Sequence, residues 1–196
     1  MHRKMILALC FFTGLLAKEL ILGADIPLPD RKMPEISGQE ISLQEALGSQ
    51  GLVVIFSCNT CPWVKAWQDR YVSLAAEYQP RGIRFIAINS NAAYREKGDS
   101  FADMKTHARQ YGYNFLYALD PQSELAKAFG ASHTPQVFLF DAHGKLVYRG
   151  AIDDNARHPD QVERPYLKNA LDELLAGKPI SLPSTKALGC SIKFAE

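Results

Sequence analysis

The chain has 196 residues, of which 47% are apolar and 10% aromatic, so it is long enough to bury a substantial core as one domain. Its 22 Lys and Arg residues are balanced by 21 Asp and Glu residues, which gives a formal net charge of +1. No run of basic residues provides the positive surface that binding to nucleic acid requires. Composition and charge therefore predict one globular domain and exclude nucleic acid as the expected partner.

The first 24 residues have the pattern of a secretory signal peptide. A basic start, residues 1–4, precedes an apolar stretch, residues 5–17, and Lys18-Glu19 interrupts that stretch before it reaches the ~20 residues of a membrane span. We therefore expect residues 1–24 to be a signal peptide cleaved near Ala24, and the protein to be exported. An uncleaved signal would instead anchor it in the membrane.

Hydrophobic periodicity predicts alternating strands and helices from residue 25 onward. A Ser37-Gly38-Gln39 turn predicts an N-terminal β-hairpin, and Ser42 with Glu45 forms a capping box for a short helix. The later elements, in order, are a strand at 52–56, a helix at 58–78, a strand at 82–88, a helix at 99–111, a strand at 115–119, a helix from 120 or 121 to 129, a hairpin of strands at 136–140 and 145–149, a helix at 166–176 and a tail at 177–196.

This order of elements predicts the fold class. Alternating strand and helix units favour parallel strands with right-handed crossovers, and the late hairpin adds an antiparallel edge. We therefore predict an α/β sandwich around a central mixed sheet, in a single domain from residue 25 to 196. Asp153 and Asp154 fall in a charged loop and are expected to be solvated, whereas Trp67 is expected to pack on the sheet.

The cysteines are few. Cys10 lies in the predicted signal, and Leu9 before it is too large for a lipoprotein cleavage site. The remaining chain has Cys58, Cys61 and Cys190, which is too sparse a set for the disulfide scaffold of a small exported protein. This pattern indicates one working pair and one additional thiol.

The working pair, Cys58-Asn59-Thr60-Cys61, lies where a buried strand meets a helix. The start of a helix has unpaired N–H groups and a partial positive charge, which stabilise a thiolate and make the disulfide a better oxidant. We interpret Cys58 and Cys61 as a redox-active dithiol that needs no other cofactor. Cys58, expected nearer the helix start, is predicted to attack, and Cys61 to resolve the mixed disulfide. A zinc site is disfavoured because no second cysteine pair or histidine spacing supplies four ligands.

At this point the sequence resembles the thioredoxin superfamily, and more closely its redoxin branch, the exported thioredoxin-like and peroxiredoxin-like proteins of bacteria. The resemblance covers about residues 25–194. Its marks are the segments Phe56–Val64, Ala87–Asn91, Thr134–Asp141, Gly144–Asp154 and Gly189–Phe194. It implies a thioredoxin-like three-layer α/β/α sandwich with an N-terminal β-hairpin extension, in a periplasmic or other extracytoplasmic protein.

The resemblance also implies a substrate groove. In that fold the proline matching Pro135 is cis and faces the dithiol, and the carbonyl and amide of the residue before it pair with the backbone of a bound partner. Thr134 and Pro135 would therefore shape the groove, and Trp63 would flank the active site. A trans proline that merely starts a strand is the alternative.

Two features common in related families are absent. Many thioredoxins carry a buried carboxylate in the strand before the dithiol, whereas residues 51–56 include no acid, so the proton acceptor of the resolving thiol is not identified. Peroxiredoxins have a Pro and a Thr or Ser before the active cysteine, but Gly51 and Ile55 stand seven and three residues before Cys58. The usual peroxidase mechanism is disfavoured, which leaves an atypical thiol peroxidase as an alternative.

The resemblance implies an antioxidant enzyme, a thiol–disulfide oxidoreductase that exchanges disulfides with protein thiols. Its expected partner is an electron-donating membrane or exported redox protein, and its own membrane contact is transient, through the signal. The alternative from another class is a module that binds and delivers copper through Cys58, Cys61 and His133, which the fold would bring near the dithiol. A plain loop histidine is the simpler interpretation of His133.

Cys190 lies in the tail and matches the redoxin branch through the segment around Gly189. It is interpreted either as an extra resolving thiol or as a small buried hydrophobic residue, and the second interpretation is preferred.

Overall fold

The computed structural model describes residues 18–195, so most of the predicted signal peptide, residues 1–17, lies outside the described residues. The centre of the fold is a five-stranded sheet in the order β5-β4-β3-β7-β8. Its strands are β3 (Gly51–Ser57), β4 (Ile83–Asn89), β5 (Leu116–Leu119), β7 (Gln136–Asp141) and β8 (Leu146–Gly150). Strands β3, β4 and β5 are parallel, β7 is antiparallel to β3, and β8 is antiparallel to β7. The predicted mixed sheet is confirmed, although of the two hairpin strands β7 is an inner strand and β8 alone lies at an edge.

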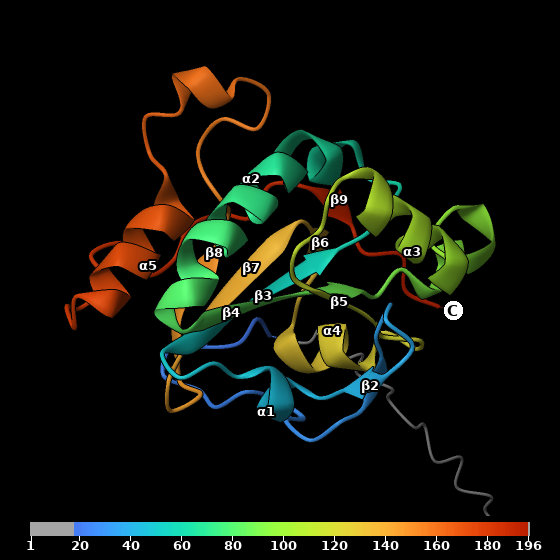
Figure 1. Ribbon diagram of the computed structural model, residues 1–196, viewed down its shortest axis with the longest axis horizontal. Coiled ribbons are helices and arrows are strands. Elements are labelled where there is room, and N and C mark those ends of the chain that lie inside the picture. Colours follow the sequence, from blue (N-terminus) through green and yellow to red (C-terminus); the bar gives the residue numbers. More distant parts are fainter. Residues whose placement is uncertain (1–17, 196) are drawn as a thin grey trace, which may run out of the picture.

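Helices cover both faces of this sheet (Figure 1). One face carries α2 (Pro62–Tyr78), α3 (Phe101–Gln110) and α5 (Tyr166–Leu175). The other carries α1 (Leu43–Ala46), α4 (Glu124–Phe129) and the short antiparallel pair β1 (Met33–Pro34) and β2 (Glu40–Ile41). The three-layer sandwich and the N-terminal hairpin are therefore confirmed.

Strand β3 explains why the sheet needs cover on both sides. All seven of its residues are buried, as its unbroken apolar sequence predicts. Val53 and Ile55 pack toward α2, while Val54 and Phe56 pack toward α4, because successive side chains of a strand point to opposite faces. The residue that follows this buried strand is Cys58, which is also fully buried.

Two helix starts are set by local sequence. The capping box of α1 is confirmed, because Ser42 Oγ accepts from the Glu45 N–H and Glu45 Oε2 accepts from the Ser42 N–H. Helix α2 begins at Pro62 rather than at Cys58, with Cys61 as its N-cap in an extended conformation. A residue before proline is pushed out of the helical region, and proline is well suited to the first helical position. The expectation that the helix starts at Cys58 is therefore wrong.

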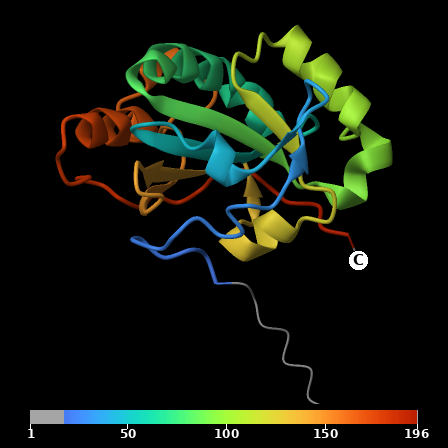
Figure 2. The ribbon, with the colours of Figure 1, turned by 60° about the horizontal axis from the view of Figure 1, so that its bottom comes forward.

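The C-terminal tail crosses more of the molecule than the sequence predicts. It leaves α5, passes beside β8, where the Thr185 N–H donates to the Arg149 carbonyl, and ends near α3 on the opposite side of the molecule (Figures 1 and 2). Near its end the tail forms β9 (Cys190–Ser191), which pairs antiparallel with β6 (His133–Thr134). The remaining short elements are the 3₁₀ turns η1 (Gln79–Arg81), η2 (Ala92–Lys97) and η3 (Pro159–Gln161).

Residues 18–24 lie against the domain. The Leu20 N–H donates to the Phe129 carbonyl at 2.9 Å, and the Gly23 N–H donates to the Leu146 carbonyl at 2.8 Å. Within the described part of the chain, no helix has the length and apolar character needed to cross a membrane.

Candidate functional site

Three thiols meet at the start of α2. The Sγ atoms of Cys61 and Cys190 are 2.8 Å apart, although 129 residues separate them in the chain. The Sγ atom of Cys58 lies 3.5 Å from the Thr134 hydroxyl, and the Sγ atom of Cys61 lies 3.1 Å from the Thr134 carbonyl oxygen. All three cysteines are free thiols. Cys58 and Cys61 are buried, whereas Cys190 is only partly buried and packs against the core beside them.

The hydrogen bonds of the site favour a thiolate at Cys61. A hydrogen bond from the Cys58 thiol lowers the pKa of Cys61, and further hydrogen bonds from the Cys190 thiol and the backbone N–H groups of Val64 and Cys190 lower it more. The same contact with Cys61, together with burial and the charge of Asp99, raises the pKa of Cys58. Cys61, at the helix N-terminus, is therefore the cysteine whose pKa these contacts lower, and the Cys58 thiol is the first of its hydrogen-bond donors.

Cys190, on β9, is held against the first turn of the same helix. Burial raises the pKa of its thiol, and so does its contact with Cys61, while a hydrogen bond from the Trp63 N–H opposes that change. These contacts therefore favour the neutral thiol form of Cys190.

A buried carboxylate fixes the loop between the two cysteines. Asp99 Oδ1 accepts from the Asn59 N–H at 2.7 Å, and Asp99 Oδ2 accepts from the Thr60 hydroxyl at 2.9 Å. Side-chain amides of Asn89 and Asn91, at the end of β4, donate to the same two oxygens at 2.9 and 3.0 Å. Asp99 has no exposed surface, and these four donors satisfy its charge, so it positions the loop.

Two further side chains complete this support. The Tyr117 hydroxyl donates to Asn59 Oδ1 at 2.9 Å, and Arg95 donates to the carbonyls of Asp99 and Asp120. Sequence reasoning missed Asp99, Arg95 and Tyr117. The only available signal was the polar character of the segment from Asn89 to Gly98, which gives no indication of which residue turns inward.

The predicted groove residues adjoin the cysteines. The Thr134–Pro135 peptide bond is cis, and Thr134 is buried between Cys58 and Cys61. Trp63, half-buried, follows Cys61 in the first turn of α2. The backbone edge of Thr134, which the resemblance assigns to a bound partner, pairs with Cys190 of the chain's own β9.

His133 is not joined to the cysteines. It lies on β6, and its Nδ1 atom is 2.8 Å from the hydroxyl of the neighbouring Ser132. Among residues 18–195, no group of three or more His, Cys, Asp or Glu side chains is arranged to hold a metal ion. The structure therefore provides no support for the copper alternative.

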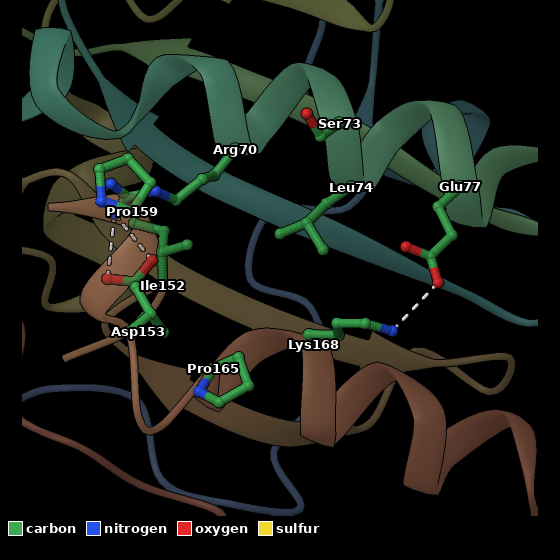
Figure 3. A pocket seen from close by; sticks show the side chains of 10 residues that line it. Arg70, Ser73, Leu74, Glu77, Ile152, Asp153, Pro159, Pro165 and Lys168 are labelled. Atoms are coloured by element: carbon green, nitrogen blue, oxygen red, sulfur yellow. Dashed lines mark hydrogen bonds and ion pairs between the residues drawn. The ribbon is translucent and has the colours of Figure 1, made fainter. Parts of the chain in front are cut away.

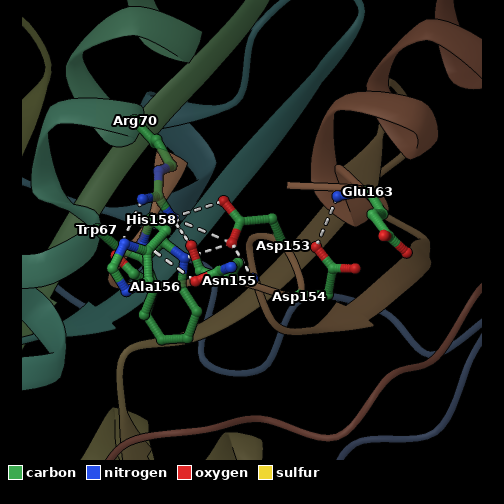
Figure 4. Close-up of polar contacts among 8 residues, drawn as sticks. All are labelled: Trp67, Arg70, Asp153, Asp154, Asn155, Ala156, His158 and Glu163. Atoms are coloured by element: carbon green, nitrogen blue, oxygen red, sulfur yellow. Dashed lines mark hydrogen bonds and ion pairs between the residues drawn. The ribbon is translucent and has the colours of Figure 1, made fainter. Parts of the chain in front are cut away.

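The charged loop after β8 is anchored to α2 by a buried ion pair (Figure 4). Asp153 accepts from the Trp67 indole N–H at 2.7 Å and pairs with the Arg70 guanidinium at 2.8 Å. Its side chain is almost fully buried, so the expected solvated position of Asp153 is wrong, whereas Asp154 is exposed. The pairing with Arg70 and Trp67 compensates for the burial of the charge. Trp67 packs in the core against the sheet, as predicted.

A cavity of about 260 Å³ lies beyond this ion pair, between α2, the loop and α5 (Figure 3). Arg70 and Asp153 stand at one end, while Glu77 and Lys168 face each other at the other end, 3.1 Å apart. None of the three cysteines lines it, so it is separate from the thiol site.

Comparison with known proteins identifies the family to which this fold belongs. Residues 25–149 match the AhpC/TSA family. A conserved protein of Geobacillus kaustophilus is 38% identical, with a TM-score of 0.82 over 89% of this chain and 93% of that one. A Sinorhizobium meliloti protein is 31% identical, with a TM-score of 0.82 over 91% and 97% of the two chains. The thiol-disulfide oxidoreductase ResA of Bacillus cereus is 23% identical over 136 residues, which are 69% of this chain and 74% of ResA. The chain therefore belongs to the AhpC/TSA family and is a thioredoxin-fold oxidoreductase of the redoxin branch.

Proposed function

We propose that this protein is a thiol–disulfide oxidoreductase that exchanges disulfides with protein thiols through Cys61. The observation that carries the proposal is the position of Cys61, at the N-terminus of α2 and in contact with the other two thiols of the site. A thiolate stabilised in this way is both a nucleophile and a good leaving group, and neighbouring thiols can close a disulfide with it.

The reaction starts at Cys61 rather than at Cys58. The Cys61 thiolate attacks one sulfur of a substrate disulfide, forms a mixed disulfide and expels the other substrate sulfur as a thiolate. A second thiol of the site then attacks the Cys61 sulfur and releases the remaining substrate thiolate. The substrate gains two electrons, and the enzyme is left with an internal disulfide, for which Cys58 is the partner proposed from the Cys-x-x-Cys spacing.

Disulfide exchange suits this site better than peroxide reduction. When the attacking residue is Cys61, the residues three and seven positions before it are Cys58 and Val54. Neither the hydroxyl nor the proline of the peroxidase pattern is therefore present. The Cys58 thiol, three positions before Cys61, instead donates a hydrogen bond to the Cys61 sulfur.

We further propose that the protein works outside the cytoplasm and is served by an exported or membrane-bound redox partner. The signal-like residues 1–24 support this proposal, as does the similarity to ResA. In such a compartment disulfides persist, so an exchange enzyme has substrates there.

The test is a redox titration combined with an insulin-reduction assay. We expect one reversible dithiol–disulfide couple between about −350 and −100 mV. Cys61→Ser is expected to abolish both the couple and the reductase activity, whereas the exposed Ser73→Ala on the same helix keeps them. Full reductase activity in Cys61→Ser, or no couple in the unmodified protein, would show that the proposed function is wrong.

A further inference from the structure

Cys190 occupies the position of a reaction partner of Cys61. Its sulfur is 2.8 Å from the Cys61 sulfur, and it is the most exposed of the three thiols. Cys58, by contrast, is fully buried in a loop that Asp99 holds through Asn59 and Thr60.

The contact between Cys190 and Cys61 is built into the backbone. Thr134 of β6 lies opposite Cys190 in the antiparallel pair, and the Ile192 N–H donates to the Ser132 carbonyl at 2.9 Å. Beyond this pair, the Lys193 N–H donates to Asn91 Oδ1 at 2.9 Å. The strand is therefore fixed on both sides of Ser191, and Cys190 is held against Cys61 by hydrogen bonds rather than by chance proximity.

Gly189 makes this close approach possible. A Cβ atom at Gly189 would lie 2.6 Å from the carbonyl carbon of Thr134 and 3.0 Å from the nitrogen of Pro135. Both contacts are with backbone atoms, which cannot move aside as a flexible side chain would. The residue before Cys190 must therefore be glycine for β9 to reach this position.

We propose that Cys190 is the resolving thiol of Cys61, so that the first internal disulfide formed in the reaction joins Cys61 to Cys190. This inference rests on the proposed function, since Cys61 must first form a mixed disulfide. Cys190 loses its proton to solvent and attacks Cys61 Sγ. The bond from Cys61 to the substrate breaks, the substrate leaves as a thiolate that takes up a proton, and the Cys61–Cys190 bond forms. Two protein thiols are oxidised and one substrate disulfide is reduced.

Cys58 then has a different task. As a thiol it donates the hydrogen bond that stabilises the Cys61 thiolate. It can later attack Cys61 Sγ, release Cys190 as a thiol and leave a Cys58–Cys61 disulfide. That step changes no oxidation level, because one disulfide is exchanged for another.

The test uses the chain from Lys18 onward and the reagent 5,5′-dithiobis(2-nitrobenzoate). This disulfide releases a coloured thiolate when a protein thiolate attacks it. The unmodified protein is expected to release two thiolates for each Cys61 that reacts, and rapid acid quenching with peptide mapping should identify Cys61–Cys190 first. The Cys190→Ser protein should release the first thiolate at the normal rate and retain the mixed disulfide on Cys61. Release of the second thiolate should be slowed about tenfold or more, because the adjacent thiol is lost. The Cys58→Ser protein should still resolve the mixed disulfide on Cys61. The substitution Ser191→Ala, at the exposed neighbour of Cys190, is the matched control.

Each result decides the question. A Cys190→Ser protein that releases the second thiolate at the unmodified rate overturns the proposal and assigns resolution to Cys58. Because serine is close to cysteine in size, circular dichroism of both variants verifies the fold. Failure of the proposed function has a separate signature, since the unmodified protein would then form no mixed disulfide at Cys61, and the role of Cys190 would fall with it.

Discussion

At the scale of single residues, the reactivity of the site depends on how many donors surround one sulfur. Cys61 receives hydrogen bonds from the Cys58 thiol, the Cys190 thiol and two backbone N–H groups, one of them that of Val64. The hydrogen bond from Cys58 lowers the pKa of Cys61 most, and Cys58 has no comparable set of donors for its own thiolate. These donors therefore lower the pKa of the cysteine nearer the helix.

This arrangement predicts a pH profile. A lowered pKa means that Cys61 remains a thiolate as the pH falls below the ~8.5 of a free cysteine, and loses reactivity only when the pH falls through the lowered value. Alkylation of Cys61 by iodoacetamide, followed by mass mapping, should therefore show an inflection well below pH 8.5. Cys58→Ala should move the inflection to higher pH because the donor is lost, whereas Cys58→Ser keeps a hydroxyl donor and should move it less. An inflection near pH 8.5 in the unmodified protein would contradict this account.

The sequence predicts that Cys58 and Cys61 form the site and favours Cys58 as the attacking thiol, whereas we propose Cys61. That choice depends on Pro62, which places the N-cap at Cys61. Asp99 is a harder case, because its role depends on side-chain amides that come from the end of β4. A carboxylate brought in from a separate segment leaves no local pattern around the cysteines.

At the scale of elements, the strands and helices of the sandwich were predictable and β9 was not. The apolar runs of β3, β7 and β8 are visible in the sequence, because burial over five or more residues determines them. Strand β9 has only two residues, one of them exposed, and its pairing with β6 depends on tertiary contacts. A strand of that length has no period to detect.

The β9 pairing predicts the effect of Gly189→Ala. A methyl group there collides with the backbone of Thr134, so β9 should detach at a local cost of about 1–3 kcal/mol. Cys61 then loses its cover, and its alkylation at neutral pH should become faster, while formation of the Cys61–Cys190 disulfide should become slower. The neighbouring, exposed Leu188→Ala is the control and should change neither rate. Unchanged rates in Gly189→Ala would show that the close approach of Gly189 to Thr134 does not hold β9 in place.

At the scale of the whole molecule, the boundary of the folded domain lies earlier than composition indicates. The Glu19 carboxylate pairs with Arg149 of β8 at 3.1 Å, and the Leu146 N–H donates to the Ala24 carbonyl at 2.9 Å. The segment 18–24 also packs closely on Gly130, where a Cβ atom would meet Glu19. These contacts join residues 18–24 to the folded domain.

We therefore predict that cleavage of the signal-like segment leaves a chain that begins at Lys18 and not at Asp25. Ala17 offers the small residue that a signal cleavage site requires, and cleavage near Ala24 would remove three backbone hydrogen bonds and one ion pair, which together contribute about 2–4 kcal/mol. N-terminal sequencing of the precursor after secretion from a bacterium tests the position. Urea unfolding should show the chain from Asp25 to be less stable than the chain from Lys18. Glu19→Gln in the longer chain, which loses only a partly exposed ion pair, should lower stability by less than about 1 kcal/mol. A mature N-terminus at Asp25 would place the domain boundary where the sequence alone suggested it. Equal stability of the two chains would also contradict this prediction, because the contacts of residues 18–24 would then contribute nothing to the fold.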